Sequence, residues 1–186
     1  SFIKRNDTAT EGCQLYLSKP LGIGILSTAA KKGLLTEDDY KTAVYWMTML
    51  NKIGTSLSHT NAVKAMTDVT GFGLLGHLLE ICQGSHLSAI INPDAVPVMD
   101  NIGHYLKHNC VPGGTYRNWK SYGSQIENAD EYVKMVFADP QTSGGLLIAV
   151  ESNSDNNFQK ICDNFSLVKI GYLEKPSQGK PLIIIE

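Results

Sequence analysis

Short apolar segments typical of β-strands alternate along this chain with segments of helical periodicity. The expected strands cover residues 21–26, 62–68, 87–91, 146–150, 167–173 and 182–185. The expected helices cover residues 36–57, 74–82, 96–109 and 154–165, with shorter helices around Tyr122 and Tyr132. Elements interleaved in this way predict an α+β (mixed α/β) domain, in which helices pack on a layered sheet. A length of 186 residues fits one large domain or two small ones.

The charge balance and the apolar pattern exclude several classes of protein. Sixteen basic and 18 acidic residues leave a formal net charge of −2, so the basic footprint of a nucleic-acid-binding protein is absent. The longest apolar stretches are far shorter than the ~20 residues that a membrane span needs, and the N-terminus has no apolar signal region. We therefore expect a soluble, cytoplasmic protein with no nucleic-acid or membrane partner.

The cysteines and histidines give no strong metal pattern. The cysteines lie far apart in the sequence, at Cys13, Cys82, Cys110 and Cys162. Zinc ligands usually cluster at short spacings, so we expect unpaired thiols in a reducing compartment. His104 and His108 could share one helix face, but the glutamate of a His-Glu-x-x-His site is missing and the flanking residues are polar.

Residues 67–77 combine polar side chains with three glycines. The stretch Gly71-Phe72-Gly73-Leu74-Leu75-Gly76 matches the Gly-x-Gly-x-x-Gly pattern of dinucleotide-binding proteins, and Asp94 follows at about the distance of a ribose-binding carboxylate. Such a fold needs an almost wholly apolar strand before the glycines. Here the strand ends in the polar residues 66–70, so a dinucleotide site is one hypothesis among several.

Asp68 supports a different hypothesis. It stands at the end of an expected strand, just before a glycine-rich turn into a helix N-terminus. Free backbone N–H groups and the helix dipole attract phosphate at such a place, and a neighbouring carboxylate suits Mg²⁺. The alternative is that Asp68 and Thr70 only cap the helix, as Asp and Thr commonly do. The residues alone leave both interpretations open.

Two further glycine-rich loops are candidates for anion binding. Residues 139–145 read Asp-Pro-Gln-Thr-Ser-Gly-Gly, which can form an anion-binding nest or an ordinary tight turn. Residues 112–118 are similar, with Arg117 as a candidate phosphate contact. A serine nucleophile is not indicated, because Ser143-Gly144-Gly145 lacks the leading glycine of a nucleophile elbow.

Several of these segments together resemble one enzyme family. They are Lys19–Leu26, Met49–Asn51, Met66–His77, Pro112–Thr115 with Asn118, and Asp139–Leu147. In wording and order they are similar to those of selenide, water dikinase (selenophosphate synthetase), and the likeness extends from about Lys4 to Glu186. The resemblance implies the C-terminal half of such an enzyme, with the fold of the aminoimidazole ribonucleotide synthetase C-terminal domain. Residues 1–14 are then the remnant of an inter-domain linker and residues 15–186 the domain.

The resemblance also implies an activity. The family makes selenophosphate from selenide, ATP and water, and releases AMP and phosphate. Its reactive Cys or selenocysteine, the neighbouring Lys, the ATP loop and most Mg²⁺ aspartates belong to the N-terminal half. We therefore expect no catalytic residue in this chain; Cys13 falls where relatives usually carry Asp. The implied partners are ATP, selenide, the enzyme's own N-terminal domain and a second subunit of a homodimer.

The family residue that carries over to this chain is Asp68, which matches an aspartate of the Mg²⁺-ATP site. Thr70, Gly71 and Gly73 are expected near the phosphates. The isolated chain is expected to lack dikinase activity and to bind ATP weakly or not at all. Two alternatives stay open: a same-fold enzyme such as aminoimidazole ribonucleotide synthetase or thiamine-monophosphate kinase, and a stand-alone dinucleotide-binding module.

Overall fold

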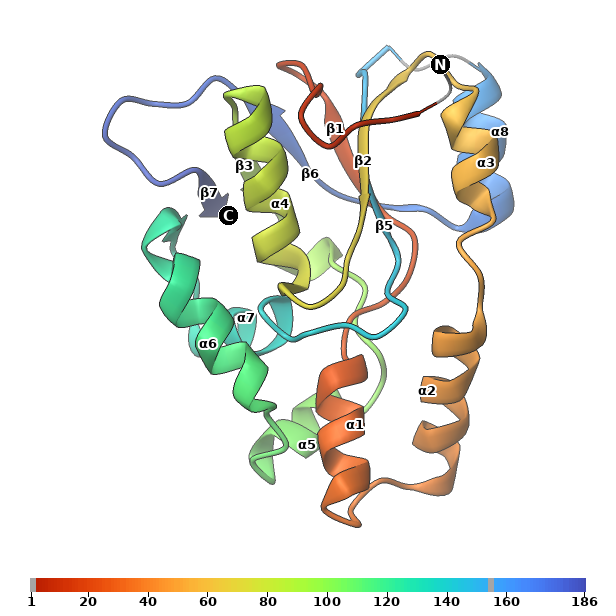
Figure 1. The fold of residues 1–186 in the computed structure, drawn as a ribbon, viewed down its shortest axis with the longest axis vertical. Helices are drawn as coiled ribbons and strands as arrows, with labels where there is room; N and C mark the ends of the chain where they lie inside the picture. Colours follow the sequence, from red (N-terminus) through yellow and green to blue (C-terminus); the bar gives the residue numbers. More distant parts are fainter. Residues whose placement is uncertain (1–2, 154–155) are drawn as a thin grey trace.

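A computed structural model describes residues 3–153 and 156–186, and these form one seven-stranded sheet flanked by helices (Figure 1). The strands are β1 (Gln14–Leu17), β2 (Val63–Asp68), β3 (Ser88–Ile91), β4 (Ile126–Glu127), β5 (Leu146–Val150), β6 (Val168–Glu174) and β7 (Ile183–Ile185). Their order is β2-β5-β1-β6-β3-β7-β4. All neighbours are antiparallel except β3–β7 and β7–β4. The α+β expectation and the strands near residues 62, 87, 146, 167 and 182 are confirmed.

Helices cover both faces of the sheet (Figure 1). They are α1 (Ile23–Lys31), α2 (Glu37–Thr48), α3 (Ile53–Ser58), α4 (Gly73–Ser85), α5 (Ile102–Lys107), α6 (Gly113–Tyr122), α7 (Glu131–Phe137) and α8 (Asn156–Phe165). The buried strand β5 separates two cores. Leu147 and Ala149 join the larger core with the apolar side of α4, whereas Ile148 packs with α3 and α8. The alternation follows from the two-residue period of a strand.

The strand predicted over residues 21–26 is wrong, because this segment contains the start of α1. Gly22 precedes the helix at φ +129°, a conformation that favours glycine. The first N–H groups of α1 are bonded by the side chains of Asp139 and Gln141, more than 100 residues away. The residues next to this segment do not reveal a cap that lies so far away in the sequence. The run of apolar residues therefore predicted a strand.

The single long helix expected over residues 36–57 is also wrong. Thr36 caps α2 as expected, accepting a hydrogen bond from the Asp39 N–H at 3.2 Å. The helix stops at Thr48 and α3 starts at Ile53. In the break, the Met49 carbonyl accepts a hydrogen bond from Lys19 Nζ at 2.6 Å, and the Asn51 side chain donates to the Gly144 carbonyl at 2.9 Å. The break therefore supplies contacts to another loop.

Three further boundaries differ from expectation. The helix expected over 74–82 continues to Ser85, so that Gly84 lies inside α4 instead of ending it, and the left-handed residue after the helix is His86. The helix expected over 96–109 shortens to α5, because residues 97 and 99 instead hydrogen-bond the backbone of Leu21. The loop expected at 112–118 contains the start of α6 at Gly113. The start of the last helix, expected at Ser154, lies outside the described residues.

Residues 5–9 run alongside the edge strand β2. The Arg5 carbonyl accepts from the Met66 N–H at 3.1 Å, and the Thr8 hydroxyl donates to the Lys64 carbonyl at 2.6 Å.

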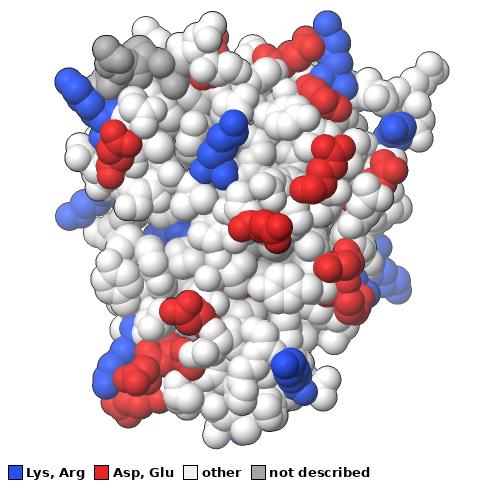
Figure 2. Space-filling model, turned by 180° about the vertical axis from the view of Figure 1, so that it is seen from behind, with Lys and Arg blue, Asp and Glu red and all other residues white. Residues whose placement is uncertain are grey.

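Figure 2 shows Lys and Arg dispersed among Asp and Glu on the opposite side of the molecule from Figure 1, with no continuous basic stripe on that side. Over the described part of the chain, no helix is both long and apolar enough to cross a membrane.

Candidate functional site

The two main glycine-rich segments of the sequence lie side by side in the structure. The backbone carbonyl of Thr70, in the loop between β2 and α4, accepts from the Gln141 N–H at 2.9 Å. The Val69 N–H donates to the Gly145 carbonyl at 2.8 Å. A Cβ on Gly144 would collide with the Val69 carbonyl, so glycine is required where the two loops touch. The sequence had indicated both loops but not their contact.

Helix α6 fixes the glycine-rich turn from the other side. The Asn118 side chain donates to the carbonyls of Gly71 and Ala138, at 2.9 and 3.0 Å, and so ties this turn to the end of α7. The Tyr122 hydroxyl donates to the Phe72 carbonyl at 2.7 Å. Asn118 and Tyr122 are both buried, so these bonds are shielded from water. Arg117, the candidate phosphate contact, is exposed on α6.

The loop 139–145 carries a buried carboxyl group of its own. Asp139 is fully buried, and its Oδ2 accepts from the N–H groups of Gly24 and Ile25 at 2.9 and 3.3 Å. Gln141 Oε1 accepts from the Ile23 N–H at 3.2 Å, and its amide donates to Asp139 Oδ2 at 2.9 Å. Burial raises the pKa of Asp139 to about 7, although these hydrogen bonds act in the opposite direction. The loop thus caps α1 instead of forming an empty nest.

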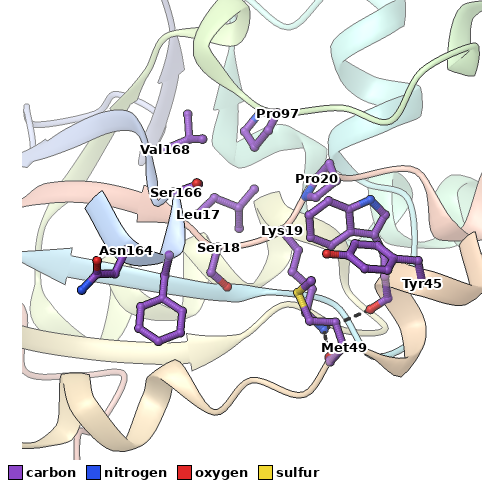
Figure 3. Close-up of a pocket in the computed structure, with 12 residues that line it drawn as sticks. Leu17, Ser18, Lys19, Pro20, Tyr45, Met49, Pro97, Asn164, Ser166 and Val168 are labelled. Atoms are coloured by element: carbon purple, nitrogen blue, oxygen red, sulfur yellow. Dashed lines mark hydrogen bonds between the residues drawn. The ribbon is translucent and has the colours of Figure 1, made fainter. Parts of the chain in front are cut away.

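Lys19 holds the other end of the same loop. Its buried ammonium donates to the carbonyls of Trp46, Met49 and Ser143, at 3.2, 2.6 and 2.8 Å. Burial lowers the pKa of Lys19. Figure 3 shows this side chain in the wall of a pocket of about 420 Å³, with Tyr45 and Met49 beside it. All three protons of the ammonium are used by carbonyls, so Lys19 is a structural anchor of the loop.

Asp68 is placed differently from these anchored groups. It ends β2, is exposed to solvent, and lies on the rim of a pocket that Lys4, Arg5 and Thr67 also line. Nearby, Arg5 is paired with Asp7, and Lys4 Nζ donates to a backbone carbonyl at 2.9 Å. Among the described residues, no hydrogen bond or ion pair occupies the Asp68 carboxylate. Its oxygens are therefore free to bind a cation.

The capping interpretation of Asp68 and Thr70 is wrong. Phe72 precedes α4, and no side chain caps that helix. The Thr70 hydroxyl lies instead 3.1 Å from Nε2 of His77, whose Nδ1 is 3.1 Å from Glu80 Oε2. His77 is buried and has a partner on each ring nitrogen. Its position in the motif was visible in the sequence, but its partners were not assigned.

The two expected phosphate-proximal glycines have different environments. Gly71 is exposed, and nothing lies within 4 Å of the position a Cβ would take. Gly73 is buried at φ +70°, and a Cβ there would lie 2.7 Å from the Ala138 carbonyl carbon. Gly71 is thus accessible to a ligand, whereas Gly73 allows α4 to pack closely on the end of α7.

The dinucleotide hypothesis does not fit the sheet. A dinucleotide-binding unit places its first two strands parallel within one βαβ unit. Here, among the described strands, β2 pairs with β5 alone and antiparallel to it, and β3 lies four positions further across the sheet. Asp94, the candidate ribose ligand, lies on a 3₁₀ turn, Pro93–Ala95.

Metal ligands do not gather elsewhere. Over the described part of the chain, no three His, Cys, Asp or Glu side chains are grouped to hold a metal ion. The rings of His104 and His108 lie 4.5 Å apart without a third ligand. The four cysteines are unpaired, as expected.

Comparison with known proteins gives a domain family and similar proteins with names. The family model for the AIR synthase related protein, C-terminal domain, matches residues 10–183. A selenide, water dikinase of Haemophilus influenzae strain 86-028NP is 47% identical over 186 residues, covering 99% of this chain and 53% of that protein. The selenide, water dikinase of Pseudomonas putida KT2440 is 52% identical over 165 residues, covering 89% and 48%. The chain thus spans about half the length of the curated relatives it matches.

Solved structures share the fold at low identity. Hydrogenase maturation protein HypE aligns with a TM-score of 0.69 at 15% identity, over 98% of this chain and 52% of that chain. Thiamine-monophosphate kinase from Stenotrophomonas maltophilia K279a aligns with a TM-score of 0.65 at 16% identity, over 98% and 52%. Identities this low show a common fold and no more.

Proposed function

This chain belongs to the family of AIR synthase related C-terminal domains, and we propose that it is the C-terminal half of a selenide, water dikinase. The proposed reaction converts ATP, selenide and water to selenophosphate, AMP and phosphate. Residues 1–14 would link residues 15–186 to an N-terminal domain that carries the reactive groups. The relatives that match at 47–52% identity are about twice as long as this chain, which supports the proposal.

The observation that carries the proposal is the free carboxylate of Asp68 beside two loops that hydrogen-bond each other. Thr70, Gly71 and Asp139 each have backbone or side-chain bonds that fix the loops, while the Asp68 oxygens have none among the described residues. A free, exposed carboxylate at the end of a strand is suited to a hard cation. Pairing of Asp68 with Leu146 of β5 fixes the backbone that carries this carboxylate.

The chemistry of the site then follows from charge. In phosphoryl transfer, Mg²⁺ neutralises the charge that develops on the transferred phosphoryl oxygens. Asp68 would supply one oxygen ligand to that Mg²⁺, and the accessible Gly71 would lie near the phosphates. Asn118 and Gln141 hold the backbone of this loop, so they would fix the position of Asp68.

The proposed partners are ATP, selenide, the N-terminal domain and a second subunit of a homodimer. The proposed location is the cytoplasm, which the unpaired cysteines support.

The test is the replacement Asp68→Asn in the full-length protein. Amide for carboxylate keeps the shape but removes the charge, so AMP formation from ATP and selenide should fall at least 100-fold, consistent with loss of a metal ligand. The melting temperature should not change, because the side chain has no partner to lose. Asp100→Asn, at another exposed aspartate, is the matched control. Near-normal AMP formation by Asp68→Asn would refute the assigned role.

The 186-residue chain alone provides a second test. It supplies one metal ligand and no glycine-rich nucleotide loop, so we expect no AMP from ATP, Mg²⁺ and selenide. Detection of AMP with the isolated chain would contradict the assignment to half of an active site. A same-fold kinase acting on another substrate is the alternative, and turnover of thiamine monophosphate by the full-length protein would favour it.

A further inference from the structure

Polar groups at its two ends hold helix α2 to the domain. Near its start, the buried Asp39 carboxylate accepts a hydrogen bond from the Tyr105 hydroxyl of α5 at 2.6 Å. At its end, the Lys19 ammonium donates to the Trp46 carbonyl at 3.2 Å. Within α2, every residue of which the structure describes, Asp39 and Ala43 alone are buried. The other apolar side chains of the helix are half-buried or exposed, so part of its apolar surface faces outward.

Three large apolar side chains are exposed beside the end of α2. Tyr45 is 56% exposed, Leu50 69% and Phe165 47%. Tyr45 and Phe165 line the pocket of about 420 Å³, and Leu50 and Phe165 line a neighbouring pocket of about 270 Å³. Met49 lies in the wall of both pockets. Figure 3 shows Tyr45 and Met49 on one side of the larger pocket and Val168 on the other. Tyr45, Leu50 and Phe165 therefore form one apolar strip along a groove.

The apolar strip lies on the same side of the sheet as the Asp68 carboxylate. Ile53, the first residue of α3, lines the smaller pocket. A Cβ on the next residue, Gly54, would lie 3.3 Å from the Leu146 side chain and 3.9 Å from that of Met66. Leu146 pairs with Asp68 and lines a pocket with it. Met66 and Asp68 are alternate residues of β2 and so share the face on which α3 packs.

The chain enters the domain from this side as well. Lys4 and Arg5 line the pocket that also contains Asp68. Lys4 Nζ donates to the carbonyl of Thr60, just after α3, and Figure 1 shows the N-terminal end of the chain beside α3 and α8. The curated relatives are about twice as long as this chain. On the proposed function, their other half precedes Ser1 and brings the remaining Mg²⁺ ligands to Asp68, so it has to lie on this side of the sheet.

We propose that the apolar strip is a docking surface for the N-terminal half of the full-length protein. The inference rests on the proposed function for the presence of that half. A single exposed apolar side chain is ordinary, whereas several gathered along a groove mark an interaction site, and aromatic residues are enriched in interfaces. Domains of one chain bury roughly 600 to 1,500 Å² against each other, which is far more than the surroundings of one carboxylate. Apolar contact at the strip would hold the two halves together, while Asp68 serves the chemistry.

Photochemical cross-linking of the full-length protein tests the identity of the partner. Benzoylphenylalanine is a photoreactive aromatic residue, so Tyr45→benzoylphenylalanine and Phe165→benzoylphenylalanine keep an aromatic ring at each position. Irradiation should link both positions to peptides that precede Ser1. Tyr132→benzoylphenylalanine is the matched control, because Tyr132 is 45% exposed on α7, whose buried side chains belong to the larger core. Links to those peptides should be lost at this control position.

The stability of the full-length protein gives a second measurement. Leu50 is 69% exposed and Leu34 43% exposed in this domain, so without a partner Leu34→Ser should lower the melting temperature more than Leu50→Ser. If the N-terminal half covers the strip, the order reverses. Leu50→Ser should then lower the melting temperature by about 3 °C or more, since a buried leucine is lost from an interface.

Other outcomes overturn the proposal. It is wrong if positions 45 and 165 give no cross-link, if they link to the C-terminal half of a second copy, or if the control position links to the N-terminal half equally well. It is also wrong if Leu34→Ser lowers the melting temperature more than Leu50→Ser. AMP formation is measured in parallel. Cross-linking as expected without AMP formation would refute the proposed function and leave this inference standing, and AMP formation without the cross-links would do the reverse.

Discussion

Replacing Asp139 by asparagine should flatten the pH dependence of the stability of this domain. Asp139 is fully buried, and burial raises the pKa of its carboxyl from 3.8 to about 7. The folded state then holds a proton that the unfolded state releases between pH 4 and pH 7. Stability from this group is therefore fully present below pH 4 and is lost as the pH rises to 7 and above.

The size of the effect follows from the shift. Three pKa units correspond to about 4 kcal/mol over the whole titration, and linkage between the two states gives roughly 2 to 3 kcal/mol between pH 5 and pH 8. The pKa of about 7 already includes the opposing effect of the N–H groups of Gly24 and Ile25, which favour the charged form. Asparagine has nearly the same shape, can accept the same N–H bonds and does not titrate in this range.

Urea unfolding at pH 5 and pH 8 measures the effect directly. The wild-type free energy of unfolding should fall relative to that of Asp139→Asn by roughly 2 to 3 kcal/mol over this interval. The control Asp100→Asn, at an exposed position, should keep the wild-type slope. Parallel slopes for the wild type and Asp139→Asn would mean that the helix N–H groups outweigh burial, and the argument for a neutral carboxyl would fail.

Three other outcomes follow from close contacts and buried groups. Gly73→Ala should destabilise the domain by about 2 kcal/mol or more, because the new Cβ would meet the Ala138 backbone at a residue with positive φ. Gly71→Ala is the control, because its Cβ would enter open space. Equal denaturation midpoints for the two variants would contradict this prediction. Lys19→Met should cost about 2 to 4 kcal/mol in urea unfolding, since three part-buried carbonyls lose the donor that they share. A wild-type midpoint would refute the anchoring role. Burial raises the pKa of the Cys82 thiol to about 12, so this thiol should react with a thiol reagent only after unfolding. Rapid labelling of the native protein would disprove its burial.

The fold could be predicted where the physical cause is local. The run Leu146–Val150 is apolar throughout, as a strand covered on both faces must be, and it forms β5, next to the edge strand β2. Thr36 has the side chain of a helix N-cap and acts as one. For Asp68 the residues left two hypotheses, a helix cap and a cation ligand, and the resemblance to a family favoured the second, which stays a prediction.

The errors arise where the cause is distant in sequence. Helix α1 is started by Asp139 and Gln141, and the interruption after α2 places the Met49 carbonyl against Lys19. Neither partner can be inferred from the residues next to the element. His77 could have been found, because helical spacing places it beside Glu80 on one face of α4, as the structure shows.

The hydrogen bonds that hold the loop 139–145 have a consequence for how the chain folds during synthesis. The bonds from Gly24, Lys19 and Asn51 to this loop span 115, 124 and 93 residues. Contacts of such range close large loops, form slowly and reward the chain only when nearly all of it is present. Helix α1 therefore leaves the ribosome without its cap and waits until residues 139–141 have been made. Truncation before Asp139 would leave helix α1 uncapped in the nascent protein, a species open to chaperones and proteases.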